Sequence, residues 1–315
     1  MNNLRLLLVV FSLIFVLPLS SRAEGLSGMD MLELSSVTRN ASMGGAGMPL
    51  IQDIGALDVN PAGLSGISKN QVLLAHTSGF ENASYEYASY GTRILRNGAG
   101  ISVYMMHQGV FDETDMTGEP IGSLSPMDLA VQMGYSYQVK TGSLRNSFGF
   151  SAKYIYRSLS IYHASAVAGD VGYLLSTTIL KKDPLSANNF NFGVSLKNFG
   201  TTIKFVNDSA PLPMSLNAGM SFSPVQALEH DLNFALGFSD FLVDRTWTAS
   251  AGAEYTYKDL LSLRMGYVVD PKSGNSFTFG VGMSQQKAVS YSIDLGLVPN
   301  PILGNVFQIG LGLEF

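Results

Sequence analysis

The amino-acid sequence predicts an all-β protein, a transmembrane antiparallel β-barrel of about 14 strands with an N-terminal segment inside its lumen. Two observations support this prediction: apolar residues alternate with small or polar ones, and charged residues are scarce. Of the 315 residues, 46% are apolar and only 14% are charged, against roughly 25% charged in ordinary soluble domains. This composition excludes a disordered chain and a nucleic-acid-binding protein. Because the chain has no cysteine, disulfides and thiolate metal sites are excluded as well.

Residues 1–23 have the features of a secretory signal peptide. An apolar run over residues 6–19 follows Arg5, and residues 21–23 (Ser-Arg-Ala) supply small side chains at the cleavage positions. A single membrane anchor is the alternative, but Pro18 and the small-residue site argue against it. Beyond residue 23 the sequence has no run of about 18 apolar residues, the length that a helix needs to cross a bilayer. The chain is therefore expected to be exported, and to use its apolar residues in strands.

The apolar residues recur with a period of two. Between residues 129 and 139 the odd positions are apolar, and small or polar residues lie between them. Such a period is typical of strands with one apolar face and one polar face. The same pattern returns at residues 148–156, 190–196, 232–238, 247–257, 277–283, 289–295 and 307–315.

A soluble β-sandwich and a membrane barrel both contain such strands, and three features favour the barrel. The polar face is mostly Gly, Ser, Thr and Asn, as a crowded lumen requires. Tyrosines lie at the strand ends, where a barrel has an interfacial girdle. The last strand ends in an aromatic residue, and its apolar positions resemble the assembly signal of bacterial outer-membrane barrels: Phe307, Ile309, Leu311, Leu313 and Phe315.

The barrel is expected to span residues 72–315. An even strand number places both chain termini on the periplasmic side. If the first strand runs outward, the long connections 107–126 and 199–212 are extracellular loops. The expected strands begin near Val72, Ser84, Gly98, Met127, Asn146, Ala164, Asn189, Pro213, Asp231, Thr246, Leu260, Ser276, Ala288 and Asn305.

Residues 24–71 do not alternate, and we expect them to fill the lumen or its periplasmic mouth. Arg39 and Asp53 are charged residues that need partners if they are buried there. Those partners are each other or charges on the wall, which the alternation places at Arg157, Asp170, Glu254, Arg264 and Asp294. Lys153 and Arg157 are open to two interpretations: a site for an anionic head group, or ion pairs with Asp170 or Glu254.

Three motifs in this segment resemble a known family. They are Arg-Asn-Ala-Ser-Met-Gly-Gly-Ala-Gly at 39–47, Asp-Ile-Gly-Ala-Leu at 53–57 and Asn-Pro-Ala-Gly-Leu at 60–64. They resemble the opening of PorV/PorQ-type outer-membrane proteins and, more distantly, of FadL-like long-chain fatty-acid transporters. Residues 57–59 (Leu-Asp-Val) depart from the pattern, because family members usually have an aromatic residue before Asn-Pro. The resemblance implies a FadL-like barrel with a hatch formed by Arg39, Gly44, Gly45, Gly47, Asp53, Asn60, Pro61 and Gly63.

The residues also suggest physical roles for these motifs. Glycines 44, 45 and 47 allow a tight fold close to a barrel wall, and Asn60-Pro61 begins a turn in which Gly63 can adopt a positive φ. The glycine run is not a phosphate loop, because no Lys-Ser/Thr follows it. Four scattered histidines and the absence of clustered catalytic side chains argue against an enzyme, a metal site and a cofactor. His76 beside Thr77 and Ser78 is the nearest approach to a lipase pair.

The sequence and the resemblance together suggest gated uptake of hydrophobic solutes, with long-chain fatty acids as the class that the family implies. The alternative is a PorV-like role as the outer-membrane partner of a secretion system. The expected partners are outer-membrane lipid, a hydrophobic or amphipathic small molecule and the barrel-assembly machinery. A secretion-system protein is a further expected partner, and nucleic acid is not expected. The charges Arg39 and Asp53 with their partners are open to two interpretations: they hold the segment in place, or they form a latch that is released when a ligand arrives.

Overall fold

The computed structural model describes residues 25–79, 83–95, 97–159, 162–183, 186–205, 208–226, 229–301 and 304–315. The predicted signal peptide, residues 1–23, lies outside the described residues. Within them, no helix is long and apolar enough to cross a membrane.

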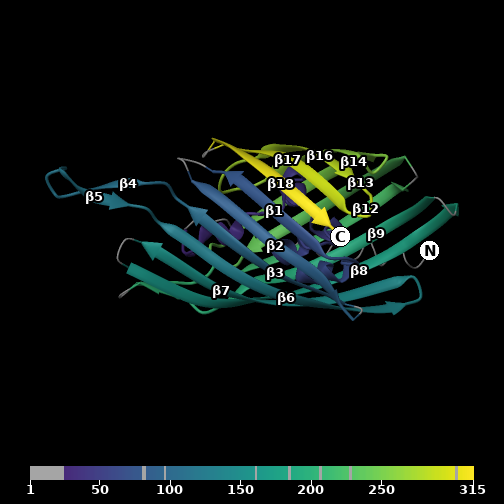
Figure 1. Ribbon diagram of the computed structural model, residues 1–315, viewed down its shortest axis with the longest axis horizontal. Coiled ribbons are helices and arrows are strands. Elements are labelled where there is room, and N and C mark those ends of the chain that lie inside the picture. The colour runs from purple at the N-terminus through teal and green to yellow at the C-terminus, as the bar shows by residue number, and fades with distance from the viewer. Residues whose placement is uncertain are drawn as a thin grey trace.

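Fourteen antiparallel strands of the described chain close into a barrel, which confirms the predicted fold class (Figure 1). Each strand begins within three residues of its expected start. The first and last strands close the ring, with Gln71 opposite Glu314 and Ser78 opposite Phe307. In chain order the barrel strands are β1 (Gln71–Ser78), β2 (Ser84–Ile94), β3 (Asn97–His107), β6 (Met127–Thr141), β7 (Leu144–Leu159), β8 (Tyr162–Asp183), β9 (Ser186–Gly200), β12 (Ser215–Gln226), β13 (His230–Phe241), β14 (Thr246–Tyr257), β15 (Leu261–Val269), β16 (Ser276–Gln285), β17 (Ser290–Asn300) and β18 (Gly304–Glu314).

Two small hairpins lie outside the ring, both within connections that were expected to be long loops. They are β4 (Phe111–Thr114) with β5 (Pro120–Leu124), and β10 (Ile203–Phe205) with β11 (Asp208–Ala210). The β4–β5 hairpin projects well beyond the barrel wall (Figure 1). We call the end of the barrel that carries both hairpins the loop end, and the end that holds Phe315 the C-terminal end.

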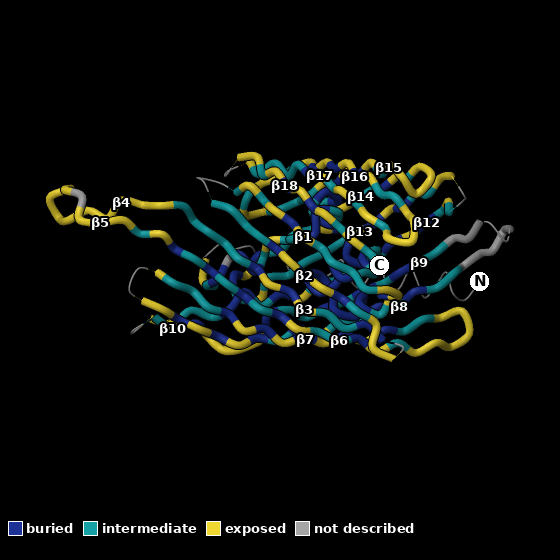
Figure 2. The backbone as a smooth tube through the Cα atoms, in the orientation of Figure 1, coloured by how far each residue is buried: buried dark blue, intermediate teal, exposed yellow. Residues whose placement is uncertain are grey.

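Exposed and buried residues alternate along the strands, as the period of two predicts (Figure 2). The outward residues are large and apolar, so the outer face is the lipid-facing surface of a membrane barrel. On β18 they are the residues of the predicted assembly signal, with Phe307 58% and Leu311 45% exposed. Phe315 follows the strand and exchanges two backbone hydrogen bonds with Asn70. An assembly role for these residues stays a prediction.

Residues 25–70 lie inside the ring, where five short helices run along the wall. The close approach of this segment depends on inward-facing glycines. A Cβ atom on Gly149 would lie 2.1 Å from the amide nitrogen of Ala62, and one on Gly280 would lie 2.2 Å from Ser42 Oγ. Because Gly149 and Gly280 lie on distant strands, the segment contacts opposite sides of the lumen. Its helices are η1 (Asp30–Glu33), α2 (Thr38–Ser42), η2 (Met48–Leu50), α3 (Ala56–Val59) and η3 (Pro61–Gly66).

The described part of the lumenal segment begins at the opposite end from Phe315. The amides of Leu26 and Ser27 donate to Asp244 Oδ1 over 2.8 and 3.0 Å, in the turn between β13 and β14 at the loop end. Residues 26–27 and residue 315 therefore lie at opposite ends of the barrel, and the periplasmic placement of the chain termini stays a prediction. The segment runs from the loop end to the C-terminal end, where β1 begins.

Candidate functional site

A chain of four charged side chains joins the lumenal segment to the wall. Arg39 on α2 donates from Nε and Nη2 to the two carboxylate oxygens of Glu254, over 2.8 and 2.6 Å. Arg264 Nε donates to the same carboxylate over 2.7 Å, and its Nη1 donates to Asp294 over 2.5 Å. The alternation of β14, β15 and β17 turns all three wall residues inward. Of the two alternatives that the sequence left open for Arg39, Asp53 or a charge on the wall, the structure shows the second, with Glu254 as the partner.

Glu254 is only 2% exposed and bridges two guanidinium groups. Its attraction to both cations is therefore little weakened by water. Burial alone would lower the pKa of Arg39, but Glu254 raises that pKa well above its ordinary value. Asp53 lies apart from this chain of contacts. Its carboxylate accepts from the amide of Gly55 over 2.8 Å, and burial raises the pKa of Asp53 although the nearby Arg39 opposes the shift.

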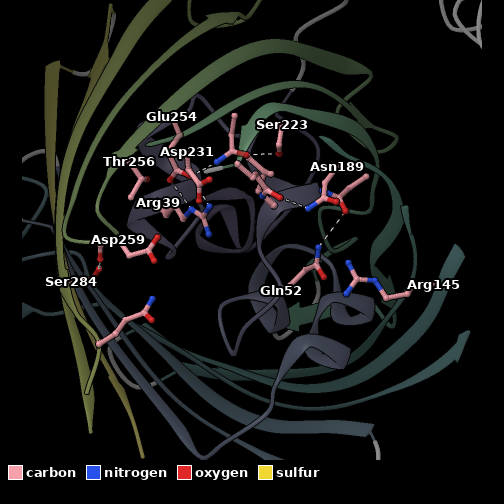
Figure 3. A pocket seen from close by; sticks show the side chains of 15 residues that line it. Arg39, Gln52, Arg145, Asn189, Ser223, Asp231, Glu254, Thr256, Asp259 and Ser284 are labelled. Atoms are coloured by element: carbon pink, nitrogen blue, oxygen red, sulfur yellow. Dashed lines mark hydrogen bonds and ion pairs between the residues drawn. The ribbon is translucent and has the colours of Figure 1, made fainter. Parts of the chain in front are cut away.

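Two pockets flank Arg39 at the C-terminal end. One has a volume of about 280 Å³ and is lined by Arg39, Gln52, Asp231 and Glu254 together with amide and hydroxyl side chains (Figure 3). The other, of about 370 Å³, lies between the segment and β16–β18 and also includes Asp53 and Asp294. The first pocket is polar, whereas the second combines charged groups with apolar residues of the segment and the wall, and apolar residues of the segment such as Ile54 and Leu64 are buried nearby.

The remaining wall charges pair with one another on β6, β7 and β8. Lys153 Nζ lies 2.9 Å from Asp170 Oδ2, and both side chains are almost fully buried. Arg157 forms a bidentate ion pair with Asp128, in which Nε and Nη2 each donate to one carboxylate oxygen over 2.6 Å. The partner of Arg157 is therefore Asp128, and not Asp170 or Glu254 as the sequence suggested.

The Asn-Pro turn fastens the segment to the other side of the barrel. Asn60 Oδ1 accepts from the amide of Ala62 over 3.0 Å, and its Nδ2 donates to the carbonyl of Tyr173 over 3.1 Å. Pro61 begins η3, as expected of a residue that lacks an amide proton. Gly63 does not adopt a positive φ, contrary to expectation; a Cβ there would lie 2.3 Å from the carbonyl oxygen of Ile51.

The other hatch glycines have two different roles. Gly44 and Gly45 adopt positive φ, at 67° and 82°, a region that glycine enters without strain. Gly47 has an ordinary φ and lies against Asn40. These three glycines turn the chain between α2 and η2.

The lumen is apolar toward the loop end. Met29, Met31 and Leu32 of the segment, each at most 6% exposed, pack there against inward wall residues and the β10–β11 hairpin. The other members of this cluster are alanines, tyrosines and branched aliphatic residues: Ala75, Tyr87, Tyr104, Ala130, Ile155, Ala164, Ala166, Ala168, Ile203 and Leu212. We call this group the apolar cluster. It is the part of the lumen whose chemistry suits a hydrophobic molecule.

Sequence reasoning missed several residues of these contacts. Asp128, Asp58 and Asp244 were not singled out. In the structure Asp128 pairs with Arg157, Asp58 accepts from the amide of Ser36, and Asp244 accepts from the hydroxyl of Ser27. The scarcity of acidic residues in the sequence was the available signal for these contacts, because a charge that is buried in a barrel requires a partner. Met29 and Met31 carried no signal, since an irregular segment has no periodicity from which to infer their direction. Among the described residues, no three His, Asp or Glu gather as metal ligands.

Solved structures share the fold. The toluene transporters TbuX of Ralstonia pickettii and TodX of Pseudomonas putida match with TM-scores of 0.56 and 0.54, each at 14% identity over 89% of this chain and 97% of theirs. The CymD monoaromatic hydrocarbon channel matches with a TM-score of 0.53 at 15% identity, over 94% and 99% of the two chains. At these identities the likeness concerns the fold alone, and it confirms the FadL-like barrel.

Two relatives in sequence come from Treponema pallidum (strain Nichols), and both are described as UPF0164 protein. Each is 25% identical, one over 206 residues (62% of this chain and 47% of the relative) and one over 169 residues (53% and 42%). The chain thus spans about half the length of these relatives. A match to the family described as Uncharacterised protein family (UPF0164) covers residues 20–290, and the chain belongs to that family.

Proposed function

We propose that this protein is an outer-membrane barrel for the gated uptake of hydrophobic solutes, with residues 25–70 as its hatch. The observation that carries the proposal is the apolar cluster, a hydrophobic region inside the barrel at its loop end. A solute from the loop end would take the place of Met29, Met31 and Leu32 against the wall. The described hydrocarbon transporters with this fold support hydrophobic solutes as a class. Long-chain fatty acids remain the finer proposal, from the resemblance to FadL-like proteins.

In this proposal the chain Arg39–Glu254–Arg264 is the latch of the hatch. It is the charged link between the segment and β14, and its release would free α2 from the wall. Arg39 also lines both pockets at the C-terminal end, so its movement would join them into one passage. The alternative is that this link holds the segment permanently in place.

The first test is mass spectrometry of lipids and hydrophobic molecules extracted from the purified protein. We expect a bound hydrophobic compound, and its absence together with normal uptake in a deletion strain would overturn the proposal. The second test compares uptake of a hydrophobic dye by Arg39→Ala and Asp53→Ala with uptake by Lys140→Ala, which removes an exposed charge. Faster uptake by Arg39→Ala supports a latch, whereas unchanged uptake supports a permanent link.

A second candidate function is the docking of another envelope protein, as in PorV-like members of the resembling family. The β4–β5 hairpin favours it, because Val110, Met116 and Ile121 are 71%, 107% and 63% exposed beside four acidic residues. Asp115 stiffens the hairpin turn by accepting from Thr117 and Glu119. If docking is the function, cross-linking in intact membranes yields one defined complex that deletion of residues 111–124 abolishes. An unchanged cross-linking pattern would exclude a role for the hairpin.

A further inference from the structure

The pocket of Figure 3 contains three charged side chains that the network around Glu254 does not use. Arg145 on β7, Asp231 on β13 and Asp259 in the turn between β14 and β15 all line it. Within the part of the chain that the structure describes, none of these three side chains has a hydrogen bond or an ion pair. Each of them is therefore available to a ligand.

These three charges are separated by sign. Asp231 and Asp259 lie close enough to repel each other, and Arg145 lies on the opposite side of the pocket (Figure 3). Arg39 and Glu254, which lie between the two sides in sequence order around the lining, neutralise each other. A simple anion would be attracted to Arg145 but repelled by the two carboxylates. A ligand that satisfies both sides carries a cation at one end and an anion at the other.

The strand order gives the length of such a ligand. β7 and β13 are separated by β8, β9 and β12 in the ring. Neighbouring strands are about 4.8 Å apart, so the two strands are roughly 19 Å apart along the wall. The side chains of Arg145 and Asp231 span part of this distance, which leaves roughly 10 Å between their charged groups. A single amino acid is too short for this gap, whereas three extended residues cover about 10 Å.

Amide side chains line the pocket between the charges. Gln52 Nε2 donates to Asn191 Oδ1 over 3.4 Å, and Gln226 Oε1 accepts from Asn189 Nδ2 over 2.5 Å. Among the contacts of the described residues, Gln52 Oε1 and Gln226 Nε2 have no partner. One free acceptor and one free donor complement the N–H and C=O of a peptide group.

The size and lining of the pocket exclude a long apolar chain. Its volume is about 280 Å³, slightly below the range of about 300–1,000 Å³ that is usual for sites of drug-sized ligands. Of the residues that line it, only Leu50 is apolar. The ligand is therefore small and polar along its whole length, unlike a molecule that fits the apolar cluster.

We propose that this pocket binds a short peptide of two or three small residues with both termini free. The ammonium group of the peptide lies between Asp231 and Asp259, and its carboxylate pairs with Arg145. Its peptide groups hydrogen-bond with Gln52 and Gln226. The peptide is a second ligand, bound at the end of the lumen opposite to the apolar cluster. This inference goes beyond the proposed uptake of hydrophobic solutes and does not depend on it.

The experiment measures calorimetric binding of four probes to the full barrel in detergent at neutral pH. The probes are triglycine, glycine, triglycine amide and omega-aminooctanoate, which has the charges and the length of triglycine but no peptide group. We expect triglycine to bind about tenfold more tightly than glycine and triglycine amide, since each of these loses a charge-assisted contact. It should bind about fivefold more tightly than omega-aminooctanoate, the effect of one hydrogen bond.

Variants of the two charged sides test the assignment, with heat-modifiable migration in gels as the check on folding. Arg145→Gln should weaken triglycine about tenfold and leave triglycine amide unchanged, because the amide carries no charge for Arg145 to pair with. Asp231→Asn should weaken both. The matched controls are Arg93→Gln on β2 and Asp240→Asn at the loop end of β13, which lie outside the pocket and should change neither affinity.

Three outcomes would overturn the inference. The first is that triglycine does not bind, or binds no more tightly than glycine. The second is that omega-aminooctanoate binds as tightly as triglycine, which would show a charge-separated site without a preference for peptides. The third is an equal loss of triglycine affinity in Arg145→Gln and Arg93→Gln. None of these outcomes affects the proposed uptake, whose test is the hydrophobic compound extracted from the purified protein.

Discussion

The two ends of the lumen hold the same segment by different means. At the C-terminal end, Arg39 enters a network with Glu254 and Arg264, in which each charge has a fixed partner. At the loop end, Met29 and Leu32 pack against alanines and tyrosines of the wall. Ion pairs depend on one geometry, whereas apolar contacts accept any apolar group of suitable size. In the proposed uptake, a solute would therefore replace the segment's own side chains at the loop end, where the contacts are apolar.

The largest effect is expected from Glu254→Ala at the polar end. Removal of this carboxylate leaves two guanidinium groups without their shared partner, which costs about 3–5 kcal/mol for a buried pair. We expect a large fall in the thermal unfolding midpoint, measured by the loss of the fast-migrating form in gels. Glu86→Ala, which removes a half-exposed carboxylate on the outer face, is the control. A midpoint that falls no further in Glu254→Ala than in Glu86→Ala would contradict the importance of the network.

The next effect concerns the apolar end. Leu32→Ala should cost about 2–4 kcal/mol, because it leaves a cavity in the cluster. Apolar cavities bind small apolar molecules, so toluene should restore part of the lost midpoint. The same addition should not restore Glu254→Ala, whose defect is an unpaired charge. Equal recovery of both variants, or of neither, would remove the distinction between the two ends.

A smaller effect is expected where the segment crosses between the ends. Gly149→Ala places a Cβ atom 2.1 Å from the amide of Ala62. Overpacking of this kind costs about 1–3 kcal/mol. Limited proteolysis should then cleave the lumenal segment faster than in Gly122→Ala, where the nearest atom is a flexible carboxylate 3.3 Å away. Equal cleavage rates in Gly149→Ala and Gly122→Ala would mean that the wall accommodates the added Cβ atom without loss of stability.

The smallest effect is a pH dependence at the loop end. Burial would raise the pKa of Asp244, but hydrogen bonds from Ser27 and Leu26 hold that pKa below its usual range. An aspartate with a lowered pKa stabilises the fold fully above its ordinary pKa near 4, and loses this effect as pH falls through the folded value. Proteolysis near residue 26 should therefore accelerate in acid. In Asp244→Asn it should be fast already at pH 7 and independent of pH; a wild-type rate that is flat with pH would contradict the tether.

The fold was predictable because its signal is periodic. A residue's position in the alternation determines whether it faces lipid or lumen, so strands such as β14 could be placed from sequence with Glu254 and Arg264 turned inward. The pairing across strands is a different matter. It depends on register, which the alternation does not specify beyond its parity, and this is why Arg157 was assigned the wrong partner.

The lumenal segment was predictable only in part. Its motifs indicated where glycine and Asn-Pro would turn the chain, and the structure places Asn60 and Gly44 at such turns. The direction of its side chains was not predictable, because an irregular chain has no period. The apolar cluster is therefore visible only in the structure, where Met29 and Met31 belong to one cluster with residues of β1, β2, β3, β6, β7 and β8.

The close contact between glycines and the lumenal segment has a consequence for the order of biogenesis. The described segment starts beside Asp244, passes through the ring and continues directly into β1, whose partner β18 is the last strand of the barrel. A wall so close that a Cβ atom added to Gly149 would lie 2.1 Å from the amide of Ala62 leaves no space for the segment to enter a finished ring. The segment must therefore already lie among the strands when β1 meets β18, so the barrel folds around its own lumenal segment. Pairing of β1 with β18 and filling of the lumen by the segment therefore take place in one step.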